Sequence, residues 1–138
     1  MASRKARLAT AAERFEGLPT IDLGDGITVH EATTWAARRD GLSGLPELPA
    51  DWGLLIAPCR SIHMFGMRFA LDLVWLGKDK DVVRVDSGVA PRRMRTCLRA
   101  RSVIEVPAGE GERFAARWRA LDQPPSAGWK PSDSELMQ

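Results

Sequence analysis

Four side chains that can carry chemistry, Cys59, His63, Arg68 and Asp72, fall within residues 59–75, the most apolar stretch of the chain. A thiol, an imidazole and a carboxylate are costly to bury unless each is paired or hydrogen-bonded. This stretch is therefore expected to hold either a structural polar pair or a functional site. We take the four residues as candidate ligand-binding residues.

Cys59 and His63 are four residues apart, a spacing that puts both on one face of a helix or of a strand. A Cys–His pair can act as a nucleophile with its base, or supply half of a metal site. A metal would need further ligands, for which only His30, Cys97 and the carboxylates are candidates. The sequence contains no Cys-x-x-Cys or His-Glu-x-x-His motif, so we predict no metal and no cofactor. The alternative to a functional pair is a small buried thiol beside a histidine at the edge of the core.

Arg68 and Asp72 would share a face if residues 63–75 formed one unbroken strand, with the other face, from His63 to Trp75, turned to the core. An Arg–Asp pair in an apolar setting would fix strand register and keep the carboxylate ionised. The alternative is a carboxylate at the mouth of a pocket, placed for proton transfer. Gly66, inside the same stretch, favours a β-bulge.

The densest positive cluster follows Ala90-Pro91 and contains Arg92, Arg93 and Arg95. Guanidinium groups can hold a phosphate or a carboxylate with two hydrogen bonds, so these three are candidate anion-binding residues. The alternative is a solvated loop. Because the formal net charge is only +2, the whole chain favours neither a nucleic acid nor a membrane as partner.

A length of 138 residues favours one domain that can bury a core without disulfides or metals. No apolar stretch approaches the roughly 20 residues of a membrane-spanning helix. The basic start lacks the apolar middle of a signal peptide, because Glu13, Arg14 and Glu16 interrupt it. We predict a soluble, cytoplasmic protein in which Cys59 and Cys97 are free thiols.

The pattern of short apolar segments predicts a mainly β fold. Gly24-Asp25-Gly26 separates two alternating runs and predicts a hairpin. Thr33 or Thr34 is expected to cap a short helix that Asp40-Gly41 ends. Residues 110–121 have helical spacing. Further strands are expected at residues 52–56, 62–67, 70–76, 82–85 and 103–106.

These elements predict a small jelly-roll-like β-sandwich or a partly open barrel with one or two short helices. We divide the chain into an N-terminal helical arm (1–19), a single mainly-β domain (20–115), and a helix end with a flexible C-terminal tail (116–138).

An ordered set of motifs resembles a widespread prokaryotic family without established activity, the domain-of-unknown-function 192 family. The motifs lie at residues 30–33, 38–42, 52–56, 62–67, 71–75, 82–85, 90–91 and 103–109. The resemblance implies a small jelly-roll-like β fold. The central family motif is Phe-Trp-Met-Lys, whereas residues 62–66 here lack the lysine. Asp72 matches the aspartate of the family. Some relatives are encoded beside pilus-assembly or secretion genes, which implies an accessory role.

The leading hypothesis is a non-catalytic module that binds a small ligand or a partner protein. Its pocket would be lined by His63, Arg68 and Asp72, together with Cys59. One alternative is an enzyme that uses Asp72 or His63 as an acid–base group, or in a metal site. Another is a cytoplasmic accessory to pilus assembly or secretion.

Overall fold

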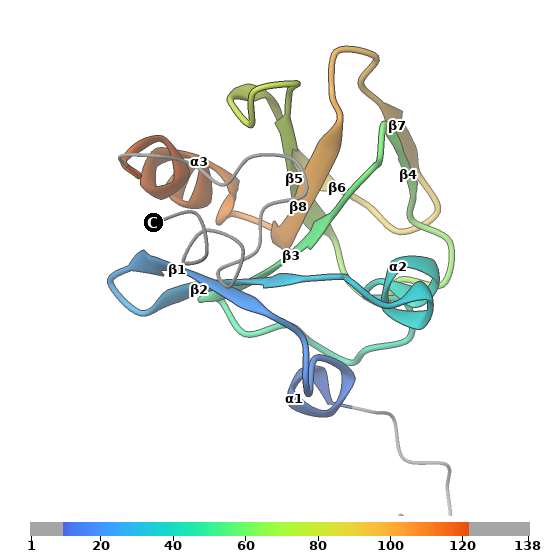
Figure 1. Cartoon of the computed structure of the whole chain (residues 1–138). Coiled ribbons are helices and arrows are strands. Elements are labelled where there is room, and N and C mark those ends of the chain that lie inside the picture. Colours follow the sequence, from blue (N-terminus) through green and yellow to red (C-terminus); the bar gives the residue numbers. More distant parts are fainter. Residues whose placement is uncertain (1–9, 122–138) are drawn as a thin grey trace, which may run out of the picture.

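A mixed sheet of six strands forms the centre of the protein in a computed structural model that describes residues 10–121 (Figure 1). All neighbouring strands in this sheet are antiparallel except β2 and β3. In spatial order the strands are β1 (Thr20–Gly24), β2 (Ile27–Glu31), β3 (Trp52–Ile56), β8 (Ser102–Pro107), β5 (Leu71–Leu76) and β6 (Val82–Val89).

A second sheet contains two short strands, β4 (Ser61–His63) and β7 (Met94–Thr96). The helices are α1 (Ala11–Arg14), α2 (Trp35–Asp40) and α3 (Gly111–Arg119). The large sheet is not closed, since β1 and β6 are its two edges. This arrangement confirms the predicted mainly β fold of a partly open barrel or sandwich.

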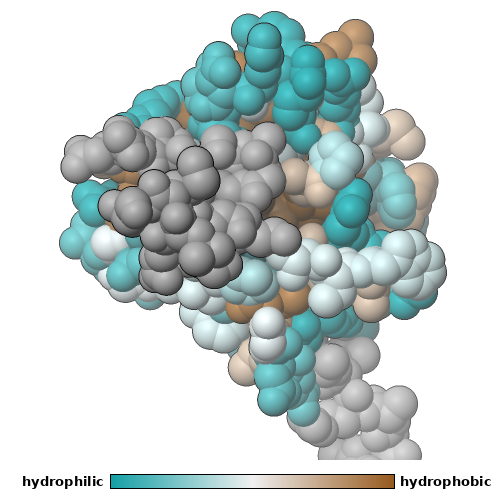
Figure 2. Space-filling view, viewed as in Figure 1, coloured by the Kyte–Doolittle hydropathy of each residue, from teal (hydrophilic) through white to brown (hydrophobic). Residues whose placement is uncertain are grey.

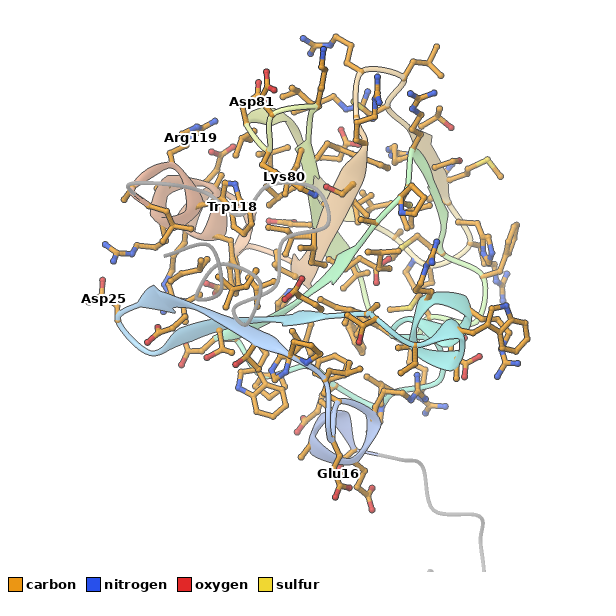
Figure 3. The ribbon with its side chains drawn as sticks, viewed as in Figure 1. Glu16, Asp25, Lys80, Asp81, Trp118 and Arg119 are labelled. Carbon is orange, nitrogen blue, oxygen red and sulfur yellow. The ribbon has the colours of Figure 1, made fainter. Side chains whose placement is uncertain are left out.

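Local sequence signals account for the first hairpin and for α2. Asp25 and Gly26, at the hairpin tip, have φ values of 56° and 79°, the conformation that Asp-Gly turns favour (Figure 3). The Thr34 hydroxyl accepts a hydrogen bond of 3.0 Å from the amide of Ala37 and caps α2. Gly41, with φ of 50°, ends the helix. Both elements lie where the sequence predicts them.

Helix α3 covers one face of the large sheet, and α2 lies on the opposite side with the β4–β7 ribbon (Figure 1). The indole N–H of Trp118 donates to the carbonyl of Lys80 at 2.7 Å, which ties α3 to the turn after β5 (Figure 3). The apolar residues of this first face are Ile21, Leu23, Ile27, Val29, Leu55, Val74, Leu76, Ile104, Val106, Phe114, Ala115 and Trp118.

The other face of the sheet packs on α2, on the loop after it and on β4. Leu54, Leu73 and Trp75 of the sheet meet Leu45 and Met64 of the covering segments. Because apolar residues cover both faces, all six residues of β5 are buried. Two buried layers therefore meet at the central strands β8 and β5.

Residues 63–75 do not form one unbroken strand, which was the condition for Arg68 and Asp72 to share a face. Strand β4 ends at His63, and β5 begins only at Leu71. Gly66 has φ of 85°, and the amide of Met67 donates to the carbonyl of Met64 at 3.2 Å. The turn breaks the alternation of faces, so the sequence positions of Arg68 and Asp72 do not place them on one strand.

Residues at both ends of the described region lie outside the predicted bounds of the mainly-β domain but belong to the same structural unit. Phe15, just after α1, is buried against the rings of His30 and Trp52. The expected boundary at residue 115 falls within α3, and the division of the chain into arm, domain and tail stays a prediction. Most of the expected tail, residues 122–138, lies outside the described residues. None of the helices in residues 10–121 has the length and apolar character needed to cross a membrane.

Candidate functional site

A pocket of about 530 Å³ lies between α2 and β4. One wall comes from α2 and the residues that follow it, and the other from β4 and the turn after it. Strands β3 and β8 contribute the remaining surface. The lining residues used below are Trp35, Arg38, Gly41, Ile56, Cys59, Ser61, Ile62, His63, Met64, Phe65 and Glu105.

Glu105 is the most deeply buried acidic group of this pocket. It lies opposite Leu54 and Leu73 in the neighbouring strands, so its side chain is on the pocket face of the sheet. The residue is 5% exposed, and its Oε1 atom has no hydrogen-bond partner among the described residues. Burial raises the pKa of Glu105 to about 7. The pocket therefore contains a carboxyl group that is partly ionised near neutral pH.

Cys59 lies half-buried in the pocket wall. Its thiol donates to the carbonyl of Ser61 at 3.4 Å. Burial raises the pKa of the Cys59 thiol; the charge of Glu105 adds to this rise, and that of Arg38 opposes it. The thiol is therefore protonated at neutral pH, which makes it a weak nucleophile.

His63 lies on the exposed side of β4 and lines the pocket with Phe65, whose ring centroid is 5.5 Å from the imidazole. Within residues 10–121, no hydrogen bond joins His63 to Cys59. The two residues thus share the pocket, as their spacing allows, without forming a nucleophile–base pair.

The mouth of the pocket carries exposed aromatic and cationic side chains. Trp35 is 73% exposed and Phe65 is 55% exposed. The guanidinium of Arg39 lies 4.4 Å from the Trp35 ring and pairs with Asp40 at 2.8 Å. Arg38, in contrast, makes no ion pair with any described residue. An unpaired cation is thus present at the mouth, while an unpaired carboxyl group lies deeper.

Asp72 does not line this pocket. It lies opposite Val106 and is therefore on the other face of the sheet, under the start of α3. Its Oδ2 accepts hydrogen bonds from the amides of Gly109 (3.0 Å) and Gly111 (2.8 Å), and its Oδ1 accepts one from Gly88 (2.8 Å). Glu110, at the N-cap of α3, makes no side-chain cap. The carboxylate of Asp72 caps the helix in its place.

The structure therefore does not bring the four candidate residues together. Cys59 and His63 line the pocket, whereas Arg68 and Asp72 do not. Arg68 is exposed on the turn before β5 and forms no ion pair with Asp72. His63 lines the pocket and Asp72 does not, and the alternative acid–base role of Asp72 or His63 stays a prediction.

The arginine cluster lies on β7 and on the turn before it. Arg92 and Arg93 are exposed before β7, and Arg95 lies within β7. The Arg95 guanidinium donates to the carbonyl of Met94 at 2.8 Å. In the view of Figure 2, hydrophilic residues cover most of the surface over the β5–β6 turn and the β7–β8 loop. Anion binding by the three arginines stays a prediction.

Sequence reasoning missed Glu105 and Arg38. Glu105 interrupts the apolar run of residues 103–106, which is the same signal that drew attention to Asp72. Arg38 carried no signal, because nothing local distinguishes it from Arg39. Within the described part of the chain, no three His, Cys, Asp or Glu side chains are grouped as metal ligands. Cys59 and Cys97 are free thiols, as predicted.

Comparison with solved structures supports the fold. A protein of unknown function from Novosphingobium aromaticivorans is similar with a TM-score of 0.60 and 20% identity, over 83% of this chain and 90% of that chain. A "putative transcription regulator" from Sinorhizobium meliloti is similar with a TM-score of 0.57 and 22% identity, over 78% of this chain and 82% of that chain. At these identities, the likeness shows the fold alone.

Comparison with the curated proteins finds no significant match. The model of a protein family described as "DUF192: Uncharacterized ACR" matches residues 20–117, most of the chain and nearly the region in which the sequence motifs resemble that family. The chain therefore belongs to the DUF192 family, a family of unknown function.

Proposed function

We propose that this protein binds a small molecule in the pocket between α2 and β4. The observation that carries the proposal is Glu105, a buried carboxyl group whose Oε1 has no partner in the described structure. Buried polar groups are nearly always hydrogen-bonded, so a missing partner points to a ligand. A volume of about 530 Å³ is within the range of small-molecule pockets.

Binding fits the pocket better than catalysis does. A cysteine nucleophile needs a lowered thiol pKa or an adjacent base. Burial instead raises the pKa of Cys59, and no hydrogen bond to His63 is present among the described residues. The proposed role of Cys59 and His63 is therefore to shape the wall of the pocket.

A small molecule also fits better than a protein segment as the occupant. The group that lacks a partner, Glu105, is 5% exposed, so only a narrow chemical group can reach it. We further propose that the protein works in the cytoplasm. The free thiols of Cys59 and Cys97 support this location, since such thiols persist in a reducing compartment.

The test is a thermal-shift and NMR screen of the full chain against amino acids, nucleotides, sugars and small carboxylic acids. Ser61→Trp would fill the pocket, because Ser61 lines it. Thr96→Trp is the matched control, since Thr96 contacts the Ser61 hydroxyl at 3.0 Å from β7 but does not line the pocket. We expect compounds that bind the native protein and Thr96→Trp but not Ser61→Trp. The proposal fails if no compound binds, or if Ser61→Trp binds every compound equally well.

A further inference from the structure

We infer that the ligand is a small zwitterion, with an ammonium or guanidinium group against Glu105 and an acidic group against Arg38. This inference rests on the proposed function, because it names the chemical class of the molecule that the pocket between α2 and β4 would bind. It is carried by two unpaired charged groups in one pocket and by the surfaces that surround them.

The first charged group is the carboxyl group of Glu105. A Cβ atom at Gly41 would lie 3.5 Å from Oε1 of Glu105 and 3.9 Å from Cδ1 of Ile56. Glycine at position 41 therefore keeps this approach to the carboxyl group free of a side chain. Burial is the cause of the raised pKa of Glu105, so no cation among residues 10–121 compensates its charge. A cation from a ligand would supply the missing compensation.

The second charged group is the guanidinium of Arg38. Arg39, the next residue, is paired with Asp40 through bonds of 2.8 and 3.1 Å. Arg14 donates to the carbonyl of Gly41 at 3.0 Å. Of these three arginines around α2, Arg38 is the one with neither an ion pair nor a hydrogen bond within the described residues. A guanidinium group in this state can bind a carboxylate through two hydrogen bonds.

Both charges act on the same stretch of pocket wall. Glu105 raises the pKa of the Cys59 thiol and Arg38 lowers it, so both lie within electrostatic reach of Cys59. Glu105 is buried, whereas Arg38 is exposed at the mouth. A ligand that meets both must carry its two charges at separate ends. Ile56, Ile62 and Met64 also line the pocket and suit an apolar connection between those ends.

The probe is 6-aminohexanoate, a chain of methylenes with an ammonium group at one end and a carboxylate at the other. Hexylamine, hexanoate and hexan-1-ol are the matched compounds that lack one or both charges. Isothermal titration calorimetry with the full chain at pH 8 should give the tightest binding for 6-aminohexanoate, followed by hexylamine. Hexanoate and hexan-1-ol should bind more weakly than either.

Two substitutions separate the two charges. Glu105→Gln should weaken the binding of both amines by about tenfold or more, because a charge-assisted hydrogen bond is lost. Arg38→Gln should weaken 6-aminohexanoate to the level of hexylamine and leave hexylamine itself unchanged. Arg39→Gln is the control, and it should alter neither affinity by more than about twofold because Arg39 is already engaged with Asp40.

Proton release gives an independent readout. An ammonium group favours the ionised form of Glu105, whose pKa is about 7 before binding. Binding at pH 7 should therefore release protons, which makes the measured enthalpy depend on the ionisation enthalpy of the buffer. The affinity for hexylamine should fall about tenfold for each pH unit below 7. Glu105→Gln should abolish both effects.

Two results would overturn the inference, and they differ from the failure of the proposed function. The zwitterion is wrong if hexanoate or hexan-1-ol binds as tightly as 6-aminohexanoate. It is also wrong if Glu105→Gln leaves the affinity for the amines unchanged. In either case, binding that Ser61→Trp blocks would keep the pocket as a ligand site. If Ser61→Trp blocks no binding of any compound, the pocket itself is not the site and both proposals fail.

Discussion

Two buried carboxyl groups lie on the adjoining central strands β5 and β8 and have opposite surroundings. Asp72 lies opposite Val106 and Glu105 lies opposite Leu73, so the two side chains are on opposite faces of the same strand pair. Asp72 accepts hydrogen bonds from two backbone amides at the start of α3, those of Gly109 and Gly111, and from a third, that of Gly88 in β6. Glu105 faces the pocket, and its Oε1 meets no donor in the described structure.

The difference shows that burial alone does not give an acidic residue its role. Asp72 is 2% exposed and Glu105 is 5% exposed, so the two are buried to nearly the same extent. The backbone around Asp72 approaches closely because Gly111 has no side chain; a Cβ atom there would lie 2.8 Å from Oδ2 of Asp72. Both carboxylate oxygens of Asp72 therefore accept hydrogen bonds from the backbone, and the role of Asp72 is to stabilise the fold. Glu105 keeps its capacity for a ligand.

The largest effect on the free energy of unfolding is expected at Asp72, the carboxyl group that is fully hydrogen-bonded. Asp72→Ala would remove three hydrogen bonds and the cap of α3, and would leave the amides of Gly88, Gly109 and Gly111 without their acceptor. We expect the free energy of unfolding to fall by about 3–4 kcal/mol. Urea denaturation followed by tryptophan fluorescence measures the change, since Trp118 on α3 is buried.

Asp51→Ala is the control for this prediction. Asp51 is an exposed acid that pairs with Arg113 of α3 at 2.7 Å, so its loss should lower the free energy of unfolding by less than about 1 kcal/mol. If Asp72→Ala proves no more costly than Asp51→Ala, the helix does not depend on the buried carboxylate, and the contrast between the two acids disappears.

The second largest effect is expected at Glu105. Replacing this residue should stabilise the protein at high pH, whereas Asp72→Ala should destabilise it. Burial raises the pKa of Glu105 from 4.5 to about 7, so the folded state binds a proton more tightly than the unfolded state does. This contribution stabilises the fold below pH 4.5 and is lost as the pH rises through 7. The loss is about 3 kcal/mol between pH 4 and pH 8. Glu105→Gln should remove this dependence and stabilise the ligand-free protein at pH 8.

Chemical denaturation of the native protein and of Glu105→Gln at half-unit steps from pH 4 to pH 9 measures this effect. The difference between the two free energies of unfolding should change mainly between pH 4.5 and pH 7. A constant difference over that interval would mean that Glu105 already has a partner in the folded protein. The contrast with Asp72 would then be lost, and with it the main support for a ligand at this position.

Local features of the sequence predict the parts of the fold that local interactions determine. The turn at Asp25 and Gly26 requires residues that tolerate positive φ, and Thr34 and Gly41 bound α2 by hydrogen bonds within a few residues. Both cysteines are free thiols, as predicted from their wide separation in the sequence and the predicted cytoplasmic location. The family resemblance is confirmed over nearly the same residues.

The remainder depends on contacts between distant segments. The three-residue strand β7 exists because it pairs with β4, and no local pattern in an arginine-rich segment reveals that pairing. The role of Asp72 requires the amides of Gly111, at the start of α3, and of Gly109 just before it, which lie 39 and 37 residues away. Glu105 escaped notice because an acid in a short strand is ordinary when one face meets solvent. Only the packing of α2 over that face shows that the acid is buried.

The smallest effect on the free energy of unfolding is expected at His30, a third buried titratable group. Its pH dependence should run opposite to that of Glu105. His30 lies against Phe15 and Trp52, at centroid distances of 4.7 and 4.6 Å, and neither ring nitrogen has a hydrogen-bond partner among the described residues. Burial lowers the pKa of His30 below 6.5. Its contribution to stability is therefore present above pH 6.5 and is lost as the pH falls, which is the reverse of Glu105.

His30→Phe keeps the aromatic contacts and removes the titration. In a Glu105→Gln background, where the larger effect is absent, the free energy of unfolding should decline from pH 7 to pH 5. Adding His30→Phe should flatten that decline. We expect the change to be smaller than that from Glu105, because a protonated imidazole beside Phe15 and Trp52 retains favourable contact with their ring faces. If the decline between pH 7 and pH 5 is unchanged, a group other than His30 causes it. Of the two buried groups, only Glu105 would then contribute to the pH dependence of stability.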